Sequence, residues 1–76
     1  MVDPQDISIL AGSTIAKARE MRGLNQAELA RAVGVDPAYL SRLEAGKKNP
    51  TIKNFYKFLA ALNCTLDLYV IPNEEL

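Results

Sequence analysis

Small, aromatic, hydroxyl and cationic side chains share one side of a short helix predicted near the middle of the chain. These side chains are Ala38, Tyr39, Ser41 and Arg42. Residues three and four positions apart lie on the same face of a helix. Hydroxyl and guanidinium groups form hydrogen bonds with base edges, and small or aromatic groups pack against thymine methyls. This face therefore predicts a surface that contacts the base pairs of a duplex.

Two short helices joined by a tight turn must position that face. Asn25 can cap a helix from about Gln26 to Val33, and Gly34 can end it by taking a left-handed backbone. Asp36 can cap a second helix, with a proline in its first turn, and Gly46 can close it. This is the layout of a helix-turn-helix DNA reader.

Apolar residues at helical spacing predict the inward faces of both helices. They are Leu29, Ala30 and Val33 in the first helix and Leu40 and Leu43 in the second. Ala30 is small enough to let the two helices cross closely.

The flanking segments predict the rest of the scaffold. Thr51 can cap a further helix, and we expect the residues of its i, i+3, i+4, i+7 stripe to face the core. The residues of this stripe are Ile52, Phe55, Tyr56 and Leu59. Asp3 and Pro4 can begin an N-terminal helical segment. Gly12 can interrupt that segment before Ser13 caps a firmer stretch, so one helix and two helices both remain open.

The chain resembles the phage repressor and Cro-like helix-turn-helix family, called the XRE family, from about Ile15 to Leu62. The resemblance rests on LNQAELA from Leu24, Gly34 in the turn, LEAG from Leu43 to Gly46, and the NP of Asn49 and Pro50. It implies a mainly α fold, a lambda-repressor-like bundle of four to five helices, with the DNA-binding domain at 1–64. It also implies a structural ion pair, because Arg19 and Glu44 match the Arg and Glu that the family pairs.

The resemblance further implies which residues contact DNA. Asn25 and Gln26 would bind phosphate at a helix N-terminus, and Ser41, Lys47 and Lys48 would add phosphate contacts. Base reading would fall to Pro37, Ala38, Tyr39 and Arg42. Among these only Arg42 offers strong discrimination, about 1–3 kcal/mol per base pair through a bidentate contact with guanine. The alternative role for Tyr39 is packing at the edge of the helix. For Asp36 we expect the role of a helix cap rather than a contact in the groove.

The distribution of charge supports a nucleic-acid partner although the formal net charge is zero. All nine cations lie between Lys17 and Lys57 with only four acids, an excess of five positive charges. Such an excess can also be an ordinary solvated surface. Lys47 and Lys48 favour the first interpretation because they directly follow the predicted recognition helix.

Length and composition exclude several other classes of protein. Seventy-six residues make one small domain with a limited core, so stability can depend on a partner or on dimerisation. No window is long and apolar enough to cross a bilayer, and the chain opens on Asp3, Pro4 and Asp6 rather than on a basic and apolar run. We therefore expect a cytoplasmic protein with no membrane partner.

The chemistry of metals, cofactors and catalysis finds little support in this sequence. The single Cys64 cannot form an internal disulfide, and without histidine there is no ligand set for zinc. Cys64 is a small packing residue, with a reactive or metal-binding thiol as the alternative. We expect no metal and no cofactor. The chain also lacks a nucleophile elbow and a phosphate-binding glycine loop, which argues against an enzyme.

The pattern changes after Asn63 to TLDLYVI, Thr65 to Ile71, a β-branched and aromatic run that predicts a strand. The chain offers no second strand, so a copy from another subunit is its natural partner. We expect 65–76 to be a dimerisation strand and tail. The dimer contacts would be Leu66, Leu68, Tyr69 and Val70. A fifth helix remains the alternative, because several of these residues also fit helical spacing.

A helical domain closed by such a strand resembles the HipB-like antitoxins. That resemblance implies a homodimer on a palindromic operator in double-stranded DNA, with a HipA-like kinase as a possible toxin partner. The acidic tail from Asn73 to Leu76 is then either a disordered end or a toxin contact. The sequence favours a repressor that is the antitoxin of such a pair and regulates its own promoter. A free-standing phage-type repressor and a protein-interaction module without DNA binding are the alternatives.

Overall fold

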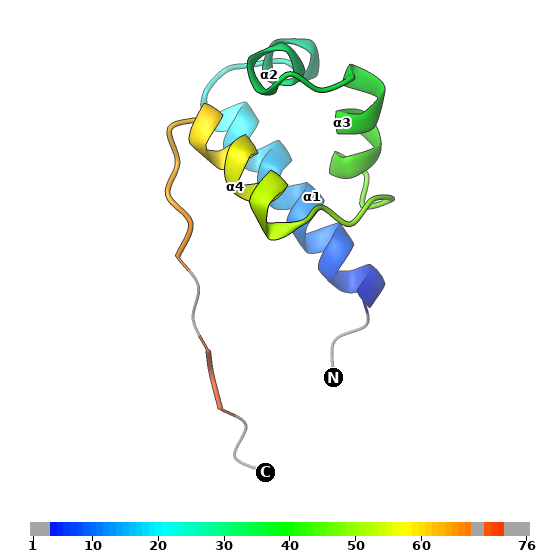
Figure 1. Ribbon diagram of the computed structural model, residues 1–76, viewed down its shortest axis with the longest axis vertical. Helices are drawn as coiled ribbons and strands as arrows, with labels where there is room; N and C mark the ends of the chain where they lie inside the picture. Colours follow the sequence, from blue (N-terminus) through cyan, green and yellow to red (C-terminus); the bar gives the residue numbers. More distant parts are fainter. Residues whose placement is uncertain (1–3, 68–69, 73–76) are drawn as a thin grey trace.

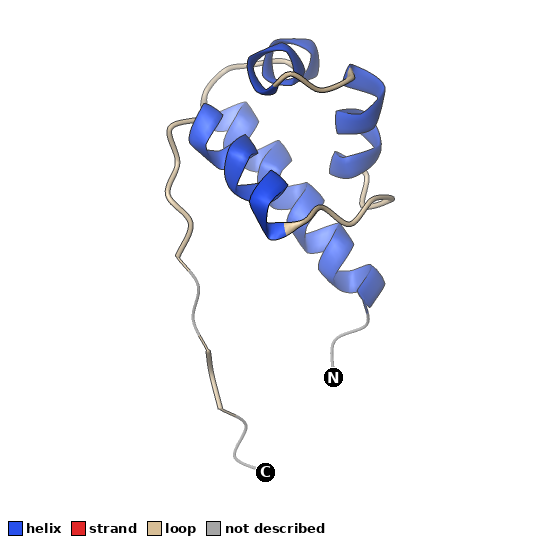
Figure 2. Ribbon diagram, viewed as in Figure 1, coloured by secondary structure: helices blue, strands red, loops and turns tan. Residues whose placement is uncertain are grey.

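The computed structural model describes residues 4–67 and 70–72, and four helices make up its regular structure (Figure 1). The helices are α1 (Pro4–Met21), α2 (Gln26–Val33), α3 (Pro37–Glu44) and α4 (Ile52–Ala61). The described part of the chain is otherwise loop and turn (Figure 2). Helix α1 packs against α3 and α4, and α2 packs against the same two helices. The predicted helical scaffold is confirmed.

Side chains cap the helices at the predicted positions. Asn25 Oδ1 accepts the amide of Glu28 at 2.8 Å, while the Glu28 carboxylate accepts the amide of Asn25 at 2.9 Å. Asp36 accepts the amide of Ala38 at 2.9 Å at the start of α3. Thr51 caps α4 in the same way, through the amide of residue 54. These caps satisfy amides that have no acceptor inside their own helix.

Glycines end the two central helices. Gly34 follows α2 with φ 84°, and its amide and that of Val35 both donate to the Ala30 carbonyl. After α3, Gly46 takes φ 79° and the Lys47 amide reaches back to the Arg42 carbonyl at 3.0 Å. The left-handed backbone that glycine adopts without steric cost makes both reversals possible.

The N-terminal segment forms one continuous helix rather than two. Gly12 lies inside α1 and does not interrupt it. A Cβ at Gly12 would lie only 2.1 Å from the Leu43 carbonyl oxygen, so this glycine permits close contact between α1 and the end of α3. Ser13 does not cap a helix; its hydroxyl donates to the Leu10 carbonyl one turn earlier. Of the two alternatives that the sequence left open, the structure therefore selects one continuous helix.

A single buried cluster joins all four helices. Its members are Ile15 from α1, Leu29 and Ala30 from α2, Leu40 and Leu43 from α3, and Phe58 and Leu62 from α4 and its end. Val33 packs against this cluster from α2, and Cys64 packs against it after α4. The inward faces predicted for α2 and α3 and the packing role predicted for Cys64 are confirmed.

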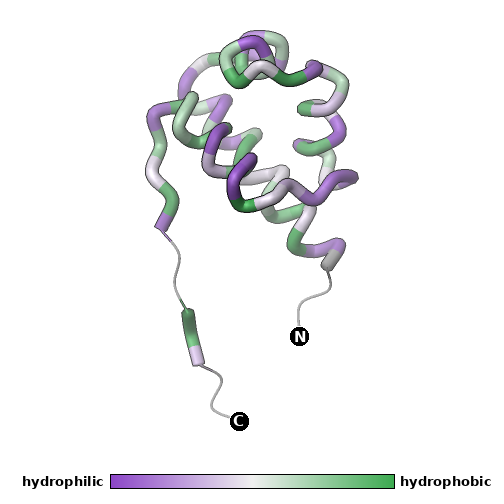
Figure 3. Tube along the Cα trace, viewed as in Figure 1, coloured by the Kyte–Doolittle hydropathy of each residue, from purple (hydrophilic) through white to green (hydrophobic). Residues whose placement is uncertain are grey.

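The stripe predicted to be the core face of α4 is partly wrong. Ile52 and Tyr56 are 72% and 58% exposed, whereas Phe58 is buried. The residues Phe55, Phe58, Leu59 and Leu62 follow the same i, i+3, i+4, i+7 spacing, so two overlapping stripes compete in the sequence. Apolar positions therefore occur around much of α4 (Figure 3), and only the contacts with α1 and α2 select the buried stripe.

The chain leaves the helices after a turn at Leu62 and Asn63 (Figure 1), where Asn63 takes φ 55°. Residues 65–67 and 70–72 form neither helix nor strand, so the described residues give no support to a fifth helix. A strand needs a partner for its ladder, and the described residues of this single chain offer none. Leu68 and Tyr69 lie outside the described residues, and the predicted strand pairing stays a prediction. No helix in the described part of the chain has the length and apolar character needed to span a membrane.

Candidate nucleic-acid interface

The face of α3 that points away from the core is exposed along its whole length. Pro37, Ala38, Ser41 and Arg42 are exposed, whereas Leu40 and Leu43 of the same helix are completely buried. Helix α3 therefore has an apolar side fixed in the core and an outer side of small and polar groups. We call Pro37, Ala38, Ser41 and Arg42 the outer face of α3.

Two of the predicted base-reading side chains have contacts within the protein. The Arg42 guanidinium lies along the outer face, where Nε donates a long hydrogen bond of 3.4 Å to the Ala38 carbonyl. A bond of that length is weak, so it can be exchanged for a contact with a base. Tyr39 is partly buried and packs against the core cluster. The structure thus places Tyr39 at the edge of the outer face, with the packing role that the sequence left open.

A compact polar network holds the outer face relative to α1 and α2. Arg19 Nε and Nη2 donate to the two Glu44 carboxylate oxygens at 2.8 and 2.9 Å. Gln26 Nε2 donates to the same carboxylate at 2.9 Å, and Arg19 Nη1 donates to the Leu24 carbonyl at 2.8 Å. The Arg19 and Glu44 side chains are only 13% and 6% exposed. The predicted ion pair is present, and a third residue completes it.

The network favours the charged form of Arg19 and holds its guanidinium in one orientation toward Glu44. Hydrogen bonding to Glu44 raises the pKa of the Arg19 guanidinium above its ordinary value, and this outweighs the opposing effect of partial burial. Arg19 is therefore charged at every pH near neutrality. A bidentate contact between a planar guanidinium and a carboxylate also constrains orientation. Residues from α1, α2 and α3 meet at Glu44, so the ends of these helices are held at one relative angle.

The residues predicted to contact phosphate lie at the two ends of the helix-turn-helix. Asn25 and Gln26 stand at the start of α2, where the first amides have no acceptor within the helix. Lys47 and Lys48 are exposed in the loop after α3, and Ser41 is exposed on α3 itself. The side chain of Gln26 is bonded to Glu44, so its backbone amide is the group left for the predicted role.

Some of the positive charge has a structural role instead. Arg22 Nε donates to the Leu62 carbonyl at 2.8 Å, and Arg22 Nη2 donates to the Asn63 carbonyl at 3.0 Å. These bonds tie the end of α1 to the end of α4. Arg19 and Arg22 are therefore bonded within the fold, although Arg22 is exposed, as are Arg31, Arg42 and the lysines of the described chain.

Comparison with known proteins agrees with this geometry. A family model described as helix-turn-helix matches residues 15–69, which include all of α2, α3 and α4. The chain belongs to this helix-turn-helix family. The match is of the XRE type, so the resemblance noted in the sequence is confirmed.

Relatives of this helix-turn-helix chain include proteins named as transcription regulators and one named as an antitoxin. A regulator of Sinorhizobium fredii, named as an uncharacterized HTH-type transcriptional regulator, is 37% identical over 92% of this chain and 91% of its own. The crystal structure of a hypothetical transcription factor from Neisseria superposes with a TM-score of 0.74 at 32% identity, covering 86% of this chain and 75% of that one. Antitoxin HipB of Escherichia coli is 34% identical over 75% of this chain and 65% of its own.

These findings establish a helix-turn-helix transcription regulator fold, which is not an enzyme fold. Sequence reasoning did not identify the bond between Gln26 and Glu44. The signal that could have found it is an amide at the first position of α2, opposite a carboxylate at the last position of α3. Nor did sequence reasoning identify the close approach at Gly12, although a glycine inside a predicted helix is a recognised sign of backbone proximity.

Proposed function

We propose that this protein is a dimeric, sequence-specific repressor that places α3 in the major groove of its operator. The observation that carries the proposal is the exposed outer face of α3, held at a fixed angle by the network around Glu44. A rigid helix with small residues at its start can approach base pairs closely. Ala38 then packs against bases, while Arg42 reads guanine through two hydrogen bonds.

The proposed phosphate contacts flank the outer face of α3. The backbone amides of Gln26 and of the residue after it, at the start of α2, face the phosphates of one DNA strand and are helped by the positive end of the helix dipole. Asn25 adds the amide group of its side chain. Lys47 and Lys48 are exposed directly after α3 and meet backbone phosphate there. Ser41 supplies a hydroxyl donor on the same face. Such contacts fix the register of the protein on DNA, and the base contacts select the sequence.

The dimer is proposed to form through the C-terminal segment. Val70 is 96% exposed and Ile71 is also exposed, which leaves apolar β-branched residues in solvent. Strand pairing with a second copy would satisfy this backbone and cover part of these side chains. Leu66, Leu68, Tyr69 and Val70 are the proposed contacts. A twofold dimer requires an operator with inverted half-sites.

The more specific proposal is that this repressor is an antitoxin that regulates its own promoter together with a HipA-like kinase. The similarity to antitoxin HipB supports it. Coexpression of tagged protein with the product of the gene beside it tests this role. A stable complex that binds the promoter more tightly than the repressor alone is the expected result. An operon in which no neighbouring gene encodes a kinase would instead support a free-standing phage-type repressor.

Selection of random duplexes with the purified protein at near-physiological salt tests DNA recognition. We expect enrichment of an inverted repeat with half-site centres about 34 Å, one helical turn, apart. Enrichment of an asymmetric single site would contradict the dimeric mode. No enrichment, together with no specific binding to its own promoter, would overturn the proposal and favour a protein-interaction module.

A further inference from the structure

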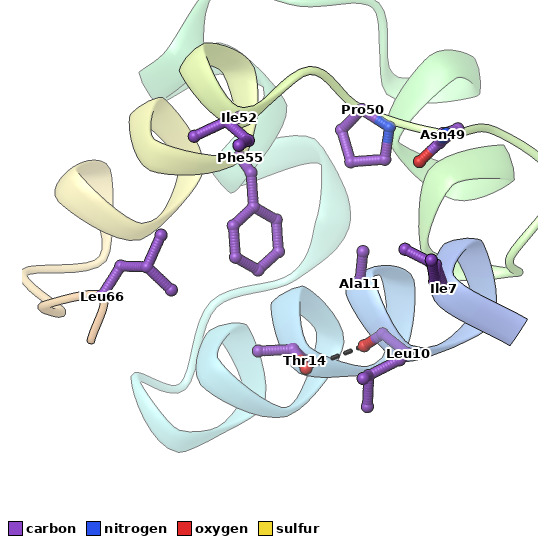
Figure 4. Close-up of a pocket in the computed structure, with 9 residues that line it drawn as sticks. All are labelled: Ile7, Leu10, Ala11, Thr14, Asn49, Pro50, Ile52, Phe55 and Leu66. Atoms are coloured by element: carbon purple, nitrogen blue, oxygen red, sulfur yellow. Dashed lines mark hydrogen bonds between the residues drawn. The ribbon is translucent and has the colours of Figure 1, made fainter. Parts of the chain in front are cut away.

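A groove of about 360 Å³ runs between α1 and α4 on the surface of the helical domain (Figure 4). Its walls come from α1, from the loop before α4, from α4 and from the C-terminal segment. The lining side chains used here are Leu10 and Thr14 of α1, Ile52 and Phe55 of α4, and Leu66. Leu66 faces Phe55 across the open space in the close-up (Figure 4).

The groove exposes apolar surface to solvent. Leu10 is 66% exposed, and Ile52 at the start of α4 is 72% exposed. The hydroxyl of Thr14 donates to the Leu10 carbonyl at 2.7 Å, so this polar group is satisfied within α1. No charged side chain lines the groove among the described residues. A contiguous apolar surface of this kind is typical of a site that another chain covers.

Leu66 connects this groove to the C-terminal segment. Leu66 contributes to the groove wall, whereas Val70 is almost fully exposed in the single chain. In the strand proposed for 65–71 every second side chain would point to the same face, so Leu66 and Val70 would share one face. The face that Leu66 turns to the groove would then also carry Val70, which no described residue covers.

The geometry of strand pairing places a second chain over the groove. A paired strand lies about 4.8 Å to the side of its neighbour. A ribbon of two strands is only marginally stable in water unless it packs on another layer. Leu66 lines the groove together with Leu10 and Ile52, so a strand paired with the segment of Leu66 on its groove side would lie over Leu10 and Ile52. The groove then supplies the apolar layer that the ribbon needs.

We infer that the groove between α1 and α4 binds the C-terminal segment of a second copy of this chain, with Val70 inserted between Leu10 and Ile52. This inference rests on the strand-paired dimer of the proposed function and adds its docking site. Charge agrees with it, because α4 exposes Lys53 and Lys57 and the sequence continues after Pro72 with Glu74 and Glu75. A docked segment would bring these acids toward the lysines of the other copy.

Crosslinking between two single-cysteine chains tests the inference. One chain carries Cys64→Ser with Leu10→Cys, and the other carries Cys64→Ser with Val70→Cys. The two are mixed, allowed to exchange, and treated with a short bismaleimide. We expect a covalent heterodimer, identified by its mass, because the two cysteines can meet only between copies. The matched control replaces Leu10→Cys by Met21→Cys, since Met21 is an exposed apolar residue of α1 outside the groove.

Equal yields of heterodimer from the Leu10 and Met21 variants would overturn the inference. It would also be overturned if one chain carrying both Leu10→Cys and Val70→Cys closed on itself as a monomer in dilute solution. That second result would mean that each segment folds back on its own groove.

Introduction of a charge into the apolar groove gives an independent measurement. By sedimentation we expect Leu10→Glu to be at least tenfold weaker in self-association, with unchanged helical circular dichroism, and Met21→Glu to match the wild type. A dimer that persists in Leu10→Glu would contradict the docking site. Duplex selection separates the two proposals. If Leu10→Glu still forms a dimer that binds an inverted repeat, the proposed repressor function stands and the docking site in the groove is contradicted. If dimerisation depends on the groove but the wild type binds no DNA, the docking site stands and the repressor function is contradicted.

Discussion

Arg19 of α1 and Glu44 of α3 form a bidentate ion pair, with N···O distances of 2.8 and 2.9 Å, at the junction of three helices. The pair is 25 residues apart in sequence and joins the first helix of the domain to the end of the helix that presents the outer face. Its geometry links the stability of the fold to the orientation of α3.

Replacement of Glu44 by Ala should destabilise the domain by roughly 2–4 kcal/mol, because it leaves Arg19 partly buried without its charge partner. Urea denaturation measures the change. The double variant Arg19→Met with Glu44→Leu should lose less, since no charge is then left unpaired. Equal losses in the single and double variants would show that packing, rather than the orphaned charge, sets the cost.

Gly12→Ala should destabilise the domain by about 1–3 kcal/mol although alanine favours helices, because its Cβ would collide with the Leu43 carbonyl. Gly34→Ala is the informative comparison. Gly34 has positive φ but open space around it, so its variant tests backbone strain without a collision. Thermal unfolding followed by circular dichroism reports both. A Gly12→Ala protein more stable than the wild type would mean that α1 and α3 separate at little cost.

Arg42→Ala should weaken binding to the selected operator by about 1–3 kcal/mol and relax the preference for guanine at one position of each half-site. Competition binding against operators mutated at single positions measures both effects. Arg31→Ala is the matched control, because Arg31 is an exposed arginine that belongs to α2 and not to the outer face of α3. If the two variants lose the same affinity and neither changes base preference, Arg42 does not read bases.

Lys47→Ala with Lys48→Ala should weaken binding to all duplexes and reduce the salt slope by about 2, one for each lost phosphate contact. Titrations at several salt concentrations give the slope. The control removes two exposed cations that lie on helices, Lys17 of α1 and Arg31 of α2, at the same net charge. An unchanged slope in the Lys47 and Lys48 variant would remove these residues from the phosphate contacts.

Leu68→Pro should release monomers, because proline donates no ladder hydrogen bond in the strand proposed for 65–71. Sedimentation across a range of concentrations measures the dimer dissociation constant. Asn73→Pro places the same residue beyond the proposed strand and should leave that constant unchanged. A Leu68→Pro protein that dimerises normally would assign the interface to the helices alone.

Local signals predicted the boundaries of the central helices with little error. The caps at Asn25 and Asp36 act on amides two or three residues away, and Gly34 acts through its own backbone angles. Such interactions are complete within a short stretch of chain, so residue type alone indicates them. The ion pair of Arg19 and Glu44, which are 25 residues apart, was predicted only from the resemblance to the family and not from local signals.

Contacts between distant segments were predicted less well. The spacing of apolar residues in α4 allowed two stripes, and the structure buries Phe58 while leaving Ile52 exposed. Gly12 was interpreted as a possible break because its neighbour across the helix interface, the Leu43 carbonyl, is not visible in local sequence. Each outcome depends on which helix lies opposite, and periodicity does not contain that information.

The sequence by itself determined the helix-turn-helix, its caps and turns, and the family to which the chain belongs. Only the tertiary structure decided that Gln26 joins Arg19 at Glu44, that α1 is continuous, and that Leu10, Ile52 and Leu66 line one groove. The physical reason is the separation along the sequence of the residues that interact. Backbone angles and caps are set by neighbouring residues, whereas buried faces, polar networks and grooves form when segments far apart in sequence pack together.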